Sequence, residues 1–136
     1  MISMRALWSA WISVLALTIV VRFTAFRGLD GHATFGLMVA YAMLSWFPCM
    51  ILNLIYSQNL TSYLKEHHNQ KWQELSDVPL FGSGSINGFR LLSFLFSQEY
   101  LGDDNVKKLK DDYKDLLKFM LIMLATFPFM FIIIAT

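Results

Sequence analysis

The sequence has few charged residues and a single cysteine. Asp, Glu, Lys and Arg make up 15% of its 136 residues and hydrophobic residues 56%, whereas soluble domains carry roughly 25% charged residues. Cys49 cannot form a disulfide within the chain, and no paired Cys/His zinc pattern accompanies it. A net charge of +1 is far from the basic surface that nucleic acid requires, so we expect no nucleic-acid partner. The composition predicts a protein dissolved in a lipid bilayer.

Three apolar stretches are long enough to cross a membrane. A hydrocarbon core of about 30 Å requires roughly 20 helical residues, and we therefore predict spans at 6–26, 33–56 and 117–136. Arg22 interrupts the first stretch, and we expect its head group to bend toward the interface. A signal peptide is the alternative for this stretch, but its end offers no small-residue cleavage site. We expect a retained helix.

The distribution of positive charge predicts the orientation. Arg22 and Arg27 lie on one side of a three-span chain, and the other nine Lys and Arg residues lie on the side of the N-terminus and the long connection 57–115. Because positive residues are retained in the cytoplasm, we expect the N-terminus and 57–115 there and the C-terminus in the periplasm or outside.

The connection 57–115 is too long for a bare loop, and its first part is predicted to be helical. Apolar residues recur in "SQNLTSYLKEHHNQKWQEL" at a spacing that lets the second span continue as a helix into the cytoplasm. Pro79, Gly82 and Gly84 then interrupt the pattern. The residues that carry the first pattern are Leu60, Leu64, Trp72 and Leu75.

A second, strongly apolar helix is predicted in "INGFRLLSFLFSQEY". One face carries Ile86, Phe89, Leu92, Phe96 and Tyr100, and another carries Arg90, Ser93 and Ser97. Leu91, Phe94 and Leu95 widen the apolar face. We expect this amphipathic helix either to lie among lipid head groups or to be clamped between the cytoplasmic helix extensions.

A third helix is predicted to run from the cytoplasm into the last span. Asp103, Asp104 and Asn105 suit its N-terminus. Pairs of Lys107 with Asp111 and of Lys108 with Asp112 are expected on its solvated face. Its apolar seam is predicted at Val106, Leu109, Tyr113, Leu116, Met120, Met123 and Phe127.

The spans offer three weak candidates for binding a lipid or a quinone. Trp46 and Pro48 lie mid-span, where the proline predicts a kink that can open a pocket. Asn53 is a polar side chain near the cytoplasmic end of the same span. Acidic and basic residues are missing near the midplanes, which disfavours a pump or a proton-coupled transporter.

His67 and His68 are weak candidates for a metal site. They are consecutive, so a helix points them about 100° apart, and neither has a ligand-type residue four positions on. We expect them to mark the cytoplasmic exit of the helix and to bind no metal. The segment "GSGSING" lacks both the GxSxG elbow and the Walker A lysine. We therefore expect neither catalysis nor a cofactor.

The order of "YLKEHHNQKWQEL", a turn with "PLF", "LLSFLFSQEY" and "DDNVKKLKDDYKDLLKFM" resembles small bacterial inner-membrane proteins of the universal stress protein B type. The resemblance covers roughly residues 50–125, with His68, Trp72, Leu75, Pro79 and the final span as its markers. Those proteins are usually shorter and have two spans, whereas this chain has three predicted spans. The resemblance implies an inner-membrane protein without established catalytic residues.

Together these features predict an all-α membrane protein, a single membrane domain over residues 1–136. Three transmembrane helices are joined by a helical cytoplasmic connection that contains an amphipathic helix. The expected function is that of a non-enzymatic accessory or interaction subunit that binds other membrane subunits or itself. The resemblance implies that this function is related to stress. The alternative is a membrane protein that binds a lipid or a quinone.

Overall fold

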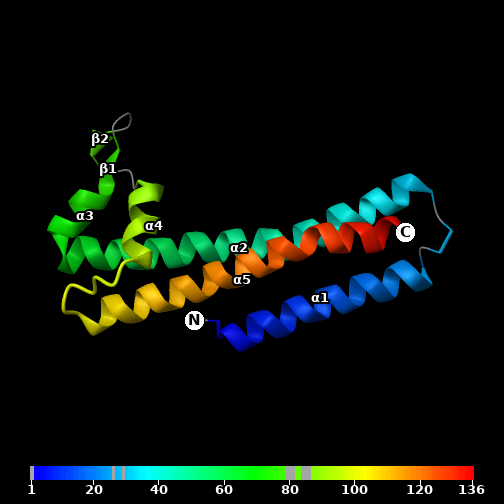
Figure 1. Ribbon diagram of the computed structural model, residues 1–136, viewed down its shortest axis with the longest axis horizontal. Coiled ribbons are helices and arrows are strands. Elements are labelled where there is room, and N and C mark those ends of the chain that lie inside the picture. The colour runs from blue at the N-terminus through cyan, green and yellow to red at the C-terminus, as the bar shows by residue number, and fades with distance from the viewer. Residues whose placement is uncertain (1, 26, 29, 79–81, 84–86) are drawn as a thin grey trace. The chain divides into compact units, whose positions relative to one another are not determined.

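The computed structural model describes residues 2–25, 27–28, 30–78, 82–83 and 87–136. The fold is helical (Figure 1), as predicted. Two short strands form an antiparallel pair in which Asp77 faces Ser83 and Val78 faces Gly82, near the predicted interruption. The elements are α1 (Met4–Thr24), α2 (Gly31–His67), α3 (Asn69–Ser76), β1 (Asp77–Val78), β2 (Gly82–Ser83), α4 (Gly88–Phe96) and α5 (Asp104–Ala135).

Three of the helices, α1, α2 and α5, are long and apolar enough to cross a membrane. They contain the predicted spans, although α1 ends at Thr24 rather than at 26. α2 continues beyond the predicted span to His67. The apolar spacing predicted one helix as far as Leu75, but the helix is interrupted at His68 and α3 follows from Asn69 to Ser76. Pro48 and Pro128 both lie inside helices that extend well beyond them in each direction.

Short polar side chains begin four of the helices. Each accepts a hydrogen bond from a backbone N–H of the first turn, which has no partner within the helix. The predicted cap Asp103 accepts from the Asn105 N–H over 2.9 Å. The other three are Ser3 before α1, Asp30 before α2 and Asn87 before α4.

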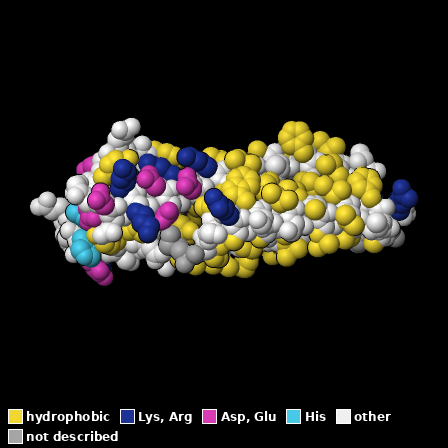
Figure 2. Space-filling view, turned by 90° about the horizontal axis from the view of Figure 1, so that it is seen from below, with side chains coloured by type: hydrophobic (Ala, Val, Ile, Leu, Met, Phe, Trp, Pro, Cys, Tyr) yellow, Lys and Arg dark blue, Asp and Glu magenta, His cyan; other side chains and the backbone are white. Residues whose placement is uncertain are grey.

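The described chain forms two compact units, which we call the apolar unit (Met1–Leu52 with Leu116–Thr136) and the polar unit (Asn53–Asp115). On the face in Figure 2, hydrophobic side chains predominate over the first and nearly all charged side chains lie over the second. Helices α2 and α5 contribute to both units. The single membrane domain over 1–136 stays a prediction.

Aromatic rings pack the interior of the apolar unit. Phe119 is buried, and its ring lies edge-on to Trp8, with centroids 4.8 Å apart, and to Trp11, with centroids 5.8 Å apart. In lipid such close packing, rather than exclusion of water, holds helices together. A first cluster contains Trp11, Cys49, Phe119 and Met123, and a second contains Tyr41, Met130 and Ile134.

Arg22, which we expected to reach toward the interface, also ties α1 to α5. Its Nε donates a hydrogen bond of 2.6 Å to the carbonyl oxygen of Ile134 in the last turn of α5. The last carbonyls of a helix lack partners within it and carry partial negative charge, so a guanidinium suits this position.

The buried line of α5 follows the predicted seam only in part. Lys110 and Phe119 are buried at positions where Leu109 and Met120 were expected and are only half-buried. The full buried line is Val106, Lys110, Tyr113, Leu116, Phe119, Met123, Met130 and Ile134. A lysine is unexpected among these buried side chains, and its ammonium group needs hydrogen-bond acceptors nearby.

The charged face of α5 also differs from the expected pairing. The Nζ atom of Lys114, one turn after Asp111, lies 3.7 Å from Oδ1 of Asp111, whereas Lys107, one turn before it, was the expected partner. The ammonium of Lys107 lies 5.5 Å above the ring centroid of Tyr100. Such exposed contacts contribute little to stability.

Candidate functional site

Helix α4 buries a different face from the one that the sequence predicted. Leu91, Phe94 and Leu95 are 5%, 4% and 0% exposed, whereas Phe89 and Phe96 on the predicted face are 88% and 60% exposed. Leu92, at 43%, completes this outer face. Of the other residues expected there, Ile86 lies outside the described residues and Tyr100 lies beyond the end of the helix.

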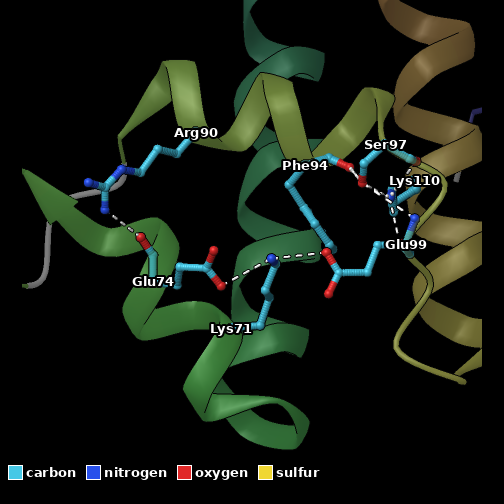
Figure 3. Close-up of polar contacts among 7 residues, drawn as sticks. All are labelled: Lys71, Glu74, Arg90, Phe94, Ser97, Glu99 and Lys110. Atoms are coloured by element: carbon cyan, nitrogen blue, oxygen red, sulfur yellow. Dashed lines mark hydrogen bonds and ion pairs between the residues drawn. The ribbon is translucent and has the colours of Figure 1, made fainter.

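The C-terminal end of α4 is held by Lys110 of α5. This side chain is fully buried, and its Nζ donates to the Ser97 carbonyl over 3.0 Å, to the Ser97 hydroxyl over 3.3 Å and to the Glu99 carbonyl over 2.7 Å (Figure 3). Ser97 caps α4. The ammonium therefore satisfies the carbonyl of the cap residue and one just beyond the C-terminal end of α4, where a positive charge also complements the helix dipole.

Aromatic rings complete the surroundings of the Lys110 ammonium. Its Nζ lies 4.2 Å from the ring centroid of Phe94 and 5.2 Å from that of Tyr100, within the range of cation–π attraction. Burial, and then the positive charge of Lys114, lowers the pKa of Lys110 to about 8. The side chain is therefore still protonated at neutral pH and can donate all three hydrogen bonds.

A second lysine, Lys71 of α3, lies on the other side of Phe94 in Figure 3. Its Nζ contacts Oε2 of Glu74 at 3.1 Å and Oε2 of Glu99 at 3.0 Å. Burial alone would lower the pKa of Lys71, but the hydrogen bonds of Glu99 and Glu74 outweigh it and raise the pKa. Arg90 donates over 2.8 Å to the carbonyl oxygen of Glu74.

These contacts connect α3, α4 and α5 around a polar hollow of about 400 Å³. The charged side chains that line it, Lys71, Glu74, Arg90 and Glu99, all take part in ion pairs or hydrogen bonds with one another or with the backbone. Their arrangement therefore serves first to hold α4 in place, with its outer apolar face directed away from the polar unit's interior.

His68 and Asp103 form the second polar group of this unit. Nε2 of His68 lies 3.0 Å from Oδ2 of Asp103, and the Tyr63 hydroxyl donates to the same oxygen over 2.7 Å. Hydrogen bonds from Tyr63 and then His68 lower the pKa of Asp103 to about 2, from an ordinary value of 3.8. The contribution of this carboxylate to stability is complete above pH 3.8 and is lost as the pH falls through about 2.

The two adjacent histidines have different surroundings, because consecutive side chains of a helix point in directions about 100° apart. The His67 ring stacks on Tyr63 with centroids 4.3 Å apart, whereas His68 reaches the cap of α5. Over the described ranges, the structure contains no group of three His, Cys, Asp or Glu side chains that could hold a metal ion. The partner of His68 lies 35 residues away, so spacing along one helix could not reveal it.

The three candidates for lipid or quinone binding do not share one hollow. Trp46 lines an apolar groove of about 360 Å³ with Phe47, Met50 and Phe127. Pro48 lines a smaller hollow of about 90 Å³ with Trp11 and Ser45. Asn53 belongs to the polar unit, where its Oδ1 is buried without a hydrogen-bond partner among the described residues.

Comparisons with known proteins leave this chain without an assigned family. No protein-family model matches it, and neither a curated protein nor a solved structure matches it.

Proposed function

We propose that this chain is a non-enzymatic subunit of a membrane assembly, and that the outer face of α4 is its contact with the partner. The supporting observation is the exposure of Phe89, Leu92 and Phe96 in the polar unit. Exposed apolar residues within the spans are covered by lipid, but these three lie outside the predicted spans. A contiguous apolar face outside the membrane marks an interaction surface.

A protein partner suits this face better than anionic lipid head groups do. Interfacial helices use Lys and Arg on their polar side to attract such head groups. Arg90 is the one basic residue of α4, and its side chain donates to the carbonyl of Glu74. The carboxylates of Glu74 and Glu99, which both contact the ammonium of Lys71, would repel anionic lipid. We therefore favour another membrane subunit or a second copy of this chain.

Photo-crosslinking from α4 tests the proposal. The photoreactive amino acid p-benzoylphenylalanine is introduced at Phe89, and native membranes are irradiated. We expect a protein adduct at about twice the mass of the 15.7 kDa chain for self-association, or at a larger discrete mass for another subunit. The same amino acid at Lys108, which is exposed on α5 in the polar unit, is the control and should give a much weaker adduct; Ser93 is unsuitable because it lies one turn from Phe89 on the same side of α4.

Two results would contradict the proposal. Adducts only with lipid at Phe89 would make α4 an interfacial helix, and equal protein adducts at Phe89 and Lys108 would remove the specific role of the apolar face. Far-UV circular dichroism of both variants in detergent checks that the helices are retained.

We further propose the orientation that the charge distribution favours and the location that the resemblance implies. The chain lies in a bacterial inner membrane, with its N-terminus and 57–115 in the cytoplasm and its C-terminus in the periplasm or outside. Nine of the eleven Lys and Arg residues then lie on the cytoplasmic side. A role in stress is supported only by the resemblance to the universal stress protein B type.

Lipid or quinone binding is the second candidate function. It is supported by the groove at Trp46, which is lined by Ala42, Met43, Phe47 and Met50 of α2 and by Leu124 and Phe127 of α5. Binding sites for apolar ligands are concave and mostly apolar, and a groove of about 360 Å³ accommodates part of an acyl or isoprenoid chain.

A further inference from the structure

A second polar hollow, of about 450 Å³, lies beside the two adjacent histidines of the polar unit. Its lining includes His67 and His68, where α2 ends, Lys71 and Glu74 of α3, and Glu99 of the turn after α4. The side chains of Glu74 and Glu99 are 64% and 48% exposed, and that of His68 is 24% exposed. A ligand from outside the chain can therefore reach them.

Both imidazole rings offer a hydrogen-bond acceptor. Nδ1 of His67 lies 3.3 Å from the carbonyl oxygen of Tyr63, and Nε2 of His68 lies 3.0 Å from Oδ2 of Asp103. Because a carbonyl or carboxylate oxygen only accepts, these two nitrogens carry the protons of the neutral rings. Nε2 of His67 and Nδ1 of His68 then have lone pairs, and neither makes a hydrogen bond within the described residues.

The two carboxylates also keep one acceptor each. Both use Oε2 to contact the ammonium of Lys71, at 3.1 Å from Glu74 and 3.0 Å from Glu99 (Figure 3). Two carboxylates that contact one ammonium are close enough to contact a single ligand as well. Their Oε1 atoms have no partner in the part of the chain that the structure describes, and one ammonium leaves the pair with an excess of negative charge.

These free groups select the kind of ligand. An anion would be repelled by the two carboxylates, and the ammonium of Lys71 is already engaged by them. A metal ion needs at least three ligands placed around one point, and the described residues contain no such group of His, Cys, Asp or Glu. An organic cation fits, because an ammonium has three N–H donors and a guanidinium five.

We propose that this hollow binds an ammonium or guanidinium group between the carboxylates of Glu74 and Glu99 and the unprotonated ring nitrogens of the histidine pair. Charge-assisted hydrogen bonds to the carboxylates supply most of the attraction. The imidazole rings, whose orientation is fixed by their other nitrogens, accept the remaining donors. The site goes beyond the proposed function and is independent of the contact at α4.

Polyamines carry the first of these groups, and arginine side chains of a partner protein carry the second. Imidazole ¹⁵N NMR of the ¹⁵N-histidine-labelled chain in phosphatidylcholine nanodiscs separates the two sources, with spermidine and N-acetyl-arginine amide as probes. His67→Asn and His68→Asn assign the resonances. At pH 8, above the range in which histidine ordinarily titrates, we expect at least one probe to cause a saturable upfield shift of an unprotonated ring nitrogen of the pair.

A control cation and two variants test the chemistry. Tetramethylammonium has the charge but no N–H donor, and should leave both resonances unchanged. Glu99→Gln keeps the shape of the side chain without its charge and should weaken binding several-fold. Glu66→Gln, at an exposed position outside the lining, should bind like the unchanged chain. Far-UV circular dichroism checks that each variant keeps its helices.

Three results would overturn the inference. Without a saturable shift from either probe, the hollow binds no such cation. Equal shifts with tetramethylammonium would leave charge attraction alone, and equal affinity in Glu99→Gln would remove the carboxylates from the site. Adducts at Phe89 depend on none of these results, so failure of the cation site is distinguishable from failure of the contact at α4.

Discussion

Replacing Lys110 by methionine is expected to release the C-terminal end of α4. The substitution keeps most of the side-chain volume but leaves the Ser97 and Glu99 carbonyls without their donor. A fully buried acceptor without a partner costs about 1–3 kcal/mol, but these two bonds are only partly buried, so we expect a loss of about 2 kcal/mol when the attraction of Phe94 for the ammonium is included. Helix α4 should then open locally far more often.

Hydrogen exchange of the α4 amides measures this loss. A change of 2 kcal/mol corresponds to exchange faster by about 30-fold in Lys110→Met. Lys108→Met is the matched control, because Lys108 is exposed on the same helix and its replacement should change stability by no more than about 0.5 kcal/mol. Equal exchange in the two variants would mean that Lys110 does not hold α4.

Leu95→Ala should destabilise the polar unit strongly, whereas Leu92→Ala should not. Leu95 is 0% exposed and Leu92 43%, although the sequence placed Leu92 at the centre of the apolar face. Truncating a fully buried leucine costs about 2–5 kcal/mol, whereas exposed positions cost at most about 0.5 kcal/mol. Chemical denaturation of the detergent-solubilised variants, followed by circular dichroism, compares them. A greater loss for Leu92→Ala would show that α4 is turned the other way.

The long helices could be predicted because their signals are local. Apolar stretches of about 20 residues predicted the three helices α1, α2 and α5 that are long and apolar enough to cross a membrane, and Asp103 predicted where α5 begins. The exact buried line of α5 could not be predicted, because Lys110 is accommodated by Ser97 and Glu99 from a different part of the chain.

The face that α4 buries could not be predicted from the sequence for the same reason. Phe89, Leu92 and Phe96 form one apolar stripe and Leu91, Phe94 and Leu95 another, so hydrophobicity alone does not choose between them. The positions of Lys71 and Lys110 over Phe94 favour the second stripe, and these contacts join segments distant in sequence. Likewise the His68 contact with Asp103 depends on the turn before α5, where Leu101 and Gly102 adopt φ values of 54° and 67°.

Cysteine accessibility in sealed spheroplasts tests the three-span orientation most directly. In a Cys49→Ala background, single cysteines replace Arg27, between α1 and α2, and Lys108, in the polar unit, both exposed. With a membrane-impermeant maleimide, we predict labelling of Arg27→Cys in sealed spheroplasts and of Lys108→Cys only after lysis. Labelling of Lys108→Cys before lysis would contradict the account.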